Sequence, residues 1–172
     1  EPLYAAIGYA ILISNQSSIQ NRIIVMDNNP VWIQFEDDML FVHKVKRVLD
    51  IISSVYSTKT SYINTFNLIG NTFGDDVNNI QFVIFSTFTE EQSTDTILYD
   101  TIMTSLSSYT NSIPHISFWN LSKYENTILP CLSDQNKTKL LSGYSPHLIS
   151  QLYTPKRYYM YTPYINILYE LN

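Results

Sequence analysis

The segment from residue 80 to residue 85 constrains the fold of this chain more than any other. Every residue in it except Gln81 is β-branched or aromatic. A strand with one face in water alternates apolar and polar residues, whereas a strand covered on both faces of a parallel sheet is apolar almost throughout. The segment therefore predicts a buried strand of a parallel sheet that has helices on both faces.

Two β-branched and aromatic runs near the start of the chain indicate a hairpin. They span residues 22–26 and 31–35, and residues 27–30, which are Asp, Asn, Asn and Pro, are typical of a tight turn. Apolar residues at helical spacing behind Pro2 predict a preceding helix over residues 2–14. The hairpin adds an antiparallel edge to the predicted sheet.

Helical and strand-like segments alternate along the rest of the chain, as in parallel α/β proteins. Further strands are expected at residues 115–119 and 139–142. Further helices are expected from the acidic residues 36–38 to 52, at 62–73, from 94 or 95 to 106, at 146–153 and from about Thr162 onward.

Polar residues and glycine predict where two of these helices begin and end. Glu36, Asp37 and Asp38 suit the N-cap and first turn of the second helix, where the helix dipole favours negative charge. The third helix is expected to end near Gly74, because glycine adopts a left-handed cap at little cost. Asp75 and the residue after it are then expected to form a loop.

Size and charge exclude several classes of partner. A chain of 172 residues is the size of one domain, so a single domain over residues 1–172 is expected. The net charge is −5, and the only basic group, Lys44, Lys46 and Arg47, is predicted to be a solvated helix face. We therefore expect no nucleic-acid partner. No apolar run approaches the roughly 20 residues of a membrane-spanning helix, so no membrane partner is expected either.

The residue types that carry out catalysis are sparse and scattered. Cys131 is the single cysteine, which excludes an internal disulfide or a thiolate metal site. His43, His115 and His147 share no metal-like spacing. The four dispersed glycines form neither a nucleophile elbow nor a phosphate-binding loop. The sequence therefore predicts a protein that is not an enzyme and holds no cofactor.

Two motifs in the second half of the chain carry a family resemblance. Residues 114–121 include Phe118-Trp119-Asn120-Leu121, and residues 141–145 include Ser142-Gly143-Tyr144-Ser145. With residues 2–14, 23–35, 59–69 and 82–86, they resemble the von Willebrand factor A-like domain of an uncharacterised family related to the TROVE proteins. The resemblance implies a three-layer, doubly wound, mostly parallel sheet with an antiparallel edge hairpin.

Domains of this kind commonly bind Mg²⁺ at the carboxyl ends of the central strands. The resemblance places three ligands in an Asp-x-Ser-x-Ser loop that would precede Glu1 and is absent here. Thr60 matches a further ligand, whereas Thr87 stands where the family has an aspartate, so a neutral hydroxyl replaces the best partner of a hard cation. Glu90 and Glu91 follow but are expected to be a solvated acidic segment. We therefore expect a degenerate site without metal, unless a preceding segment supplies ligands.

The resemblance also implies that the first central strand is missing from this chain. That strand would lie between the hairpin and residues 82–85, and an open slot there would leave backbone groups unpaired. Either a preceding stretch of the same polypeptide or another chain is expected to supply it, and we favour the first.

The remaining candidate feature is a tyrosine-rich tail. Tyr158, Tyr159, Tyr161 and Tyr164 offer amphipathic contact area suited to interfaces, although the same residues could equally cover the domain's own sheet. We expect a non-catalytic interaction or structural module that binds other proteins. Abundant Asn, Ile and Tyr are typical of AT-rich genomes, including those of large DNA viruses, so capsid or self-assembly partners and a cytoplasmic or virion location are expected. The alternative is a Mg²⁺-dependent adhesion or ribonucleoprotein-type binding domain completed by an N-terminal segment.

Overall fold

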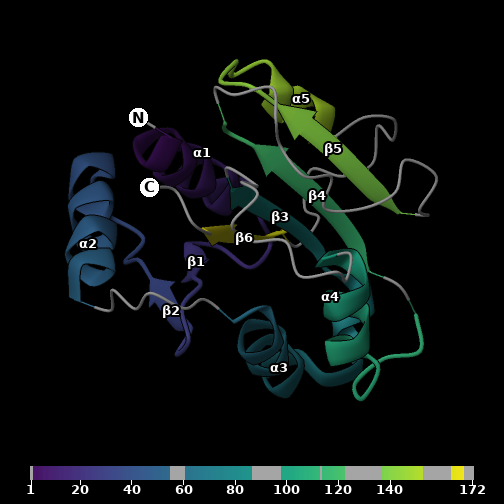
Figure 1. Ribbon diagram of the computed structural model, residues 1–172. Coiled ribbons are helices and arrows are strands. Elements are labelled where there is room, and N and C mark those ends of the chain that lie inside the picture. The colour runs from purple at the N-terminus through teal and green to yellow at the C-terminus, as the bar shows by residue number, and fades with distance from the viewer. Residues whose placement is uncertain are drawn as a thin grey trace.

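The computed structural model describes residues 2–54, 61–86, 98–112, 114–122, 137–152 and 164–168. Six strands form one sheet in the order β2-β1-β6-β3-β4-β5 (Figure 1). Only β1 and β2 pair antiparallel, and every other neighbouring pair is parallel. The strands are β1 (Arg22–Val25), β2 (Val31–Gln34), β3 (Gln81–Ser86), β4 (His115–Asn120), β5 (Thr138–Ser142) and β6 (Tyr164–Leu168).

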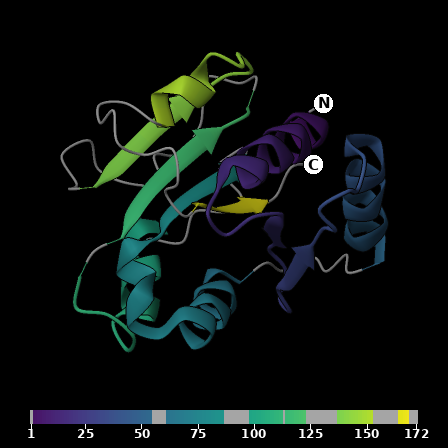
Figure 2. The ribbon, with the colours of Figure 1, turned by 180° about the vertical axis from the view of Figure 1, so that it is seen from behind.

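Helices cover both faces of this sheet, which gives the molecule three layers (Figures 1 and 2). The first face packs against α1 (Pro2–Gln16), α2 (Phe41–Ser54) and α5 (Leu148–Leu152). The second face packs against α3 (Tyr62–Phe73), the 3-10 helix η1 (Gly74–Asn79) and α4 (Leu98–Leu106). The predicted mixed α/β architecture, with an antiparallel edge hairpin and a parallel centre, is confirmed.

The central position of β3 explains why residues 82–85 are all apolar. Phe82 and Ile84 point into the core beneath α3 and α4, whereas Val83 and Phe85 point into the core beneath α1. All four side chains are fully buried. Burying a side chain of this size contributes about 1.5–3 kcal/mol, so β3 stabilises both layers at once.

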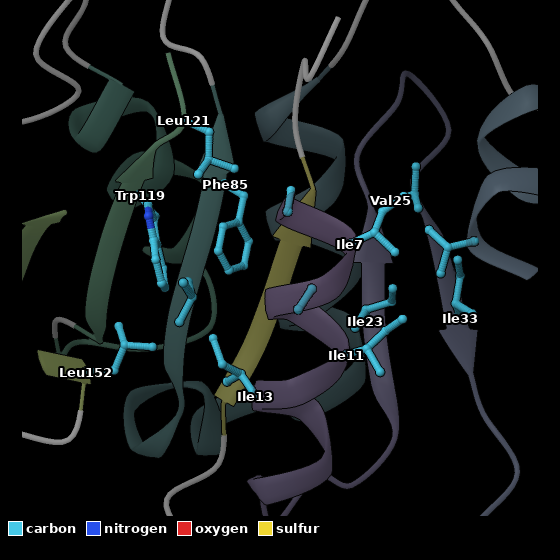
Figure 3. Packing of buried hydrophobic residues seen from close by; sticks show 14 of the residues in the cluster. Ile7, Ile11, Ile13, Ile23, Val25, Ile33, Phe85, Trp119, Leu121 and Leu152 are labelled. Atoms are coloured by element: carbon cyan, nitrogen blue, oxygen red, sulfur yellow. The ribbon is translucent and has the colours of Figure 1, made fainter. Parts of the chain in front are cut away.

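Helix α1 lies across the middle of the sheet and contains no charged residue. Figure 3 shows Ile7 and Ile11 directed towards Ile23 and Val25 of β1, and all four belong to one buried cluster. Ile13 lies farther along the helix, towards the centre of the sheet. The helix therefore bridges the hairpin and the central strands.

Most predicted elements are confirmed, but several boundaries were wrong. Helix α2 begins only at Phe41, and its first turn contains no acidic residue, so residues 36–38 do not cap it. Residues 75 and 76 belong to η1 rather than to a loop. Helix α5 begins at Leu148 because residues 146 and 147 form a turn. The proposed caps of α4 at residues 94 and 95 lie outside the described residues.

The largest error concerns the end of the chain. The helix expected from about Thr162 was wrong, because Tyr164–Leu168 form strand β6. This strand pairs in parallel with β1 on one side and with β3 on the other. The expectation of an unfilled central position was therefore also wrong: the chain's own C-terminal segment occupies the place between the hairpin and residues 82–85.

Replacing glycine with alanine is expected to have opposite effects on stability at two helical positions, Gly70 and Gly8. A methyl group at Gly70 of α3 would overlap the ring of Tyr109, which is held by a 3.0 Å hydrogen bond from its hydroxyl to Asn71 Oδ1. A methyl group at Gly8 of α1 would meet no atom within 4 Å. We expect Gly70→Ala to cost about 1–3 kcal/mol and Gly8→Ala to stabilise by about 0.5–1 kcal/mol. Urea unfolding of both variants tests this, and a stabilised Gly70→Ala would contradict the packing described.

Candidate functional site

Helix α2 is anchored by an unusual buried lysine. Lys44 is only 4% exposed, although its neighbours Lys46 and Arg47 are exposed. Its Nζ donates to Asn21 Oδ1 at 2.7 Å and to Asn15 Oδ1 at 2.9 Å. The prediction of a solvated basic face is therefore confirmed for Lys46 and Arg47 and wrong for Lys44. A buried ammonium requires such oxygen partners because desolvation without them is costly.

The partners of Lys44 tie three segments together. Asn15 lies in the last turn of α1. Asn21 immediately precedes β1 with a positive φ of 58°, a conformation that asparagine tolerates better than most residues. The Asn21 Nδ2 group donates to Asp37 Oδ1 at 2.9 Å. Asp37 thus orients an amide instead of capping a helix. Lys44 Nζ also lies 5.4 Å from the centre of the Phe35 ring, close enough for a cation–π contact.

Three consecutive apolar residues stand exposed beside this anchor. Leu40 is 64% exposed, Phe41 is 48% exposed and Val42 is 64% exposed. The Leu40 carbonyl accepts hydrogen bonds from the backbone N–H groups of His43 and Lys44, which fixes these residues in the first turn of α2. We call Leu40, Phe41 and Val42 the α2 apolar surface. Phe41 lies at helical spacing from the buried Val48, but its side chain is nevertheless exposed.

Charged residues border the α2 apolar surface on two sides. Glu36 and Asp38 are exposed in the segment that leads into the helix. Lys46 and Arg47 are exposed one turn beyond Val42 and His43 on the same helix. An apolar centre with a polar rim is the usual anatomy of a protein–protein interface.

The two motifs that carried the family resemblance meet at the carboxyl end of the sheet. Trp119 Nε1 donates to the Gly143 carbonyl at 2.9 Å, and the Gly143 N–H donates to the Asn120 carbonyl at 3.0 Å. The Tyr144 hydroxyl donates to the Leu121 carbonyl. Gly143 has a φ of 103°, a backbone conformation that favours glycine. These contacts join the end of β4 to the turn that follows β5.

Tyr9 of α1 completes this cluster from above the sheet. Its ring stacks on Trp119 with centroids 4.8 Å apart, and its hydroxyl donates to the Tyr144 carbonyl. Desolvation by burial raises the pKa of both the Tyr9 and Tyr144 phenols. Both therefore remain protonated donors at neutral pH, which suits a structural role.

The described residues bring no predicted ligand or histidine pair together. His43 lies on α2, His115 opens β4, and His147 precedes α5, each exposed. Among the described residues, no group of three or more His, Cys, Asp or Glu side chains is placed to hold a metal ion. Within the same part of the chain, no helix is both long and apolar enough to cross a bilayer.

Most residues predicted from the sequence to form a site fall outside the described residues. This applies to Cys131 and to the candidate metal and interaction residues Thr60, Thr87, Glu90, Glu91, Tyr158, Tyr159 and Tyr161. Tyr164 opens β6, where its backbone lies in register with Gln81 of β3. The α2 apolar surface was not identified from the sequence, although three successive apolar residues cannot all face the core from a helix.

The fold and surface define an α/β protein with a mainly parallel sheet covered on both faces. Residues 1–158 match the model of a family described as a domain of unknown function (DUF7788). Because this match covers most of the chain, the protein belongs to that family. No curated protein and no solved structure matches the chain.

Proposed function

We propose that this domain is a non-catalytic protein-binding module that docks its partner on the α2 apolar surface. The observation that carries the proposal is the exposure of Leu40, Phe41 and Val42 in one continuous run. Apolar residues exposed singly are ordinary on protein surfaces, whereas three in succession lower solubility. A role in binding explains why they are present.

The anchoring of α2 supports the same proposal. The hydrogen bonds from Lys44 to Asn15 and Asn21 hold the first turn of the helix against α1 and β1. A surface held rigidly before binding loses less conformational entropy on association. The partner should therefore present an apolar groove, with basic groups facing Glu36 and Asp38 and acidic groups facing Lys46 and Arg47.

We also propose that the fold is von Willebrand factor A-like and doubly wound. Two observations support this: the hairpin lies at one edge, separated from β3 by a single central position, and the Trp119 and Gly143 motifs pack together. The degenerate metal site, the Tyr-rich tail as a second contact and a structural role in a virion remain parts of the proposal that rest on the sequence.

Substituting Val42 with aspartate tests the docking surface. A photo-crosslinking residue at His43, which is exposed beside the surface, first captures the partner from cells that express the native protein. The affinity of the purified partner is then measured by calorimetry. We expect Val42→Asp to weaken binding at least about tenfold, or roughly 1.4 kcal/mol, because a charge must be buried in an apolar groove. Unfolding stability should change by less than about 0.5 kcal/mol.

A matched control is available on α3. Ile63 is 53% exposed and is followed by the exposed Asn64, so Ile63→Asp introduces the same charge outside the α2 apolar surface. This variant should bind the partner as tightly as the unmodified protein. Equal affinity of the Val42→Asp variant and the unmodified protein would refute the docking surface, as would equal losses in the two variants.

A further inference from the structure

The last strand of the chain fills the middle of the sheet. Ile167 of β6 lies in register with Ile24 of β1 and with Ile84 of β3. Strands β1 and β3 do not pair with each other. Each therefore presents a complete backbone edge towards the other, and β6 satisfies both. We call the space between these two edges the β1–β3 slot.

Strand β6 differs from its neighbours in how it is attached to the domain. The family match covers residues 1–158 and ends before Tyr164, so β6 lies outside the shared region. Both of its pairings are with strands far away in sequence, and it forms no hairpin. Its release would break no hairpin, but it would unpair β1 and β3 and remove a strand against which α1 packs, so an equivalent strand must take its place.

We propose that the β1–β3 slot is a strand-exchange site that accepts β6 from a second copy of this chain. The occupant follows from fit, because Tyr164–Leu168 is the one sequence shown to match both edges in register, and a second copy carries it. Reciprocal exchange recreates the same pairings in both copies and needs no new complementary surface. Its main cost is the entropy of association, which rising concentration offsets. This inference goes beyond the proposed docking function and does not depend on the α2 apolar surface.

Two single-cysteine variants test the exchange in the full chain, with Cys131 replaced by serine in both. Val25 and Leu168 are register partners across β1 and β6, a spacing that suits a disulfide. Folded Val25→Cys and Leu168→Cys proteins are mixed at several concentrations, oxidised, denatured and separated without reductant. We expect a mixed disulfide between the two variants, identified by mass spectrometry of the linked peptides and increasing with concentration and incubation time, because neither variant alone carries both cysteines.

A control and a second pair make the result decisive. Ile33→Cys mixed with Leu168→Cys should give no such product, since β1 separates β2 from β6. If Val25→Cys fails to fold by circular dichroism, Val83→Cys and Asn166→Cys, register partners across β3 and β6, replace the first pair. The proposal is overturned if the two-chain product does not exceed the control. It is also overturned if Val25→Cys and Leu168→Cys on one chain give only single-chain disulfides at every concentration.

Discussion

Replacing Trp119 with alanine is expected to lower the free energy of unfolding by about 3–5 kcal/mol. The side chain is fully buried and stacks against Tyr9 and Phe85 at 4.8 and 5.2 Å between centroids. Its loss would leave a large cavity between α1 and the sheet. It would also leave the Gly143 carbonyl without its indole donor. Urea unfolding followed by far-UV circular dichroism measures the loss of stability. Circular dichroism is chosen over fluorescence because removing Trp119 changes the fluorescence of the protein.

A loss of this size is a large part of the 5–15 kcal/mol that stabilises an ordinary domain, so a milder variant is needed beside it. Trp119→Phe keeps an aromatic ring in the core and removes only the N–H donor and part of the volume. We expect it to cost about 1–2 kcal/mol, mostly from the unpaired Gly143 carbonyl. Equal costs for the alanine and phenylalanine variants would contradict the importance of the stacking and leave only the hydrogen bond.

The fold was predictable where the hydrophobic pattern of a segment matched the burial that neighbouring elements impose on it. The apolar run of β3 needed burial on both faces, and the structure supplies α1 on one side and α3 with α4 on the other. Strand β6 was not predictable in the same way. The five residues Tyr164–Leu168 fit a short helix or a strand equally well. The choice is made by the backbone edges of β1 and β3, which lie far away in the sequence.

The candidate surface was only partly predictable for a related reason. Lys44 was grouped with Lys46 and Arg47 by charge, but it lies four residues before the buried Val48 and so shares the inward face of α2. Its partners, Asn15 and Asn21, are ordinary polar residues until the fold brings them to the ammonium group. The spacing between Phe41 and Val48 also allows Phe41 on the inward face, but its side chain is exposed in the structure.

Replacing Lys44 with alanine is expected to cost about 2–3 kcal/mol, mainly because the amide oxygen of the buried Asn21 loses a charged donor. Lys46→Ala on the same helix is the control and should change stability by less than about 0.5 kcal/mol, since its side chain is exposed. Chemical unfolding of both variants under identical salt conditions provides the comparison. Similar costs for the two lysines would show that the buried network contributes nothing.

A double-mutant cycle isolates the contact between Lys44 and Asn21. Asn21→Gly removes the amide and keeps a residue that tolerates the positive φ of 58°. If the 2.7 Å hydrogen bond stabilises the fold, the double variant Lys44→Ala/Asn21→Gly should cost less than the two single losses combined, by about 1 kcal/mol or more. Simple additivity would mean that the two residues act separately. Because this contact holds the first turn of α2, a coupled result also predicts that Lys44→Ala weakens partner binding at Leu40, Phe41 and Val42 without altering any of them.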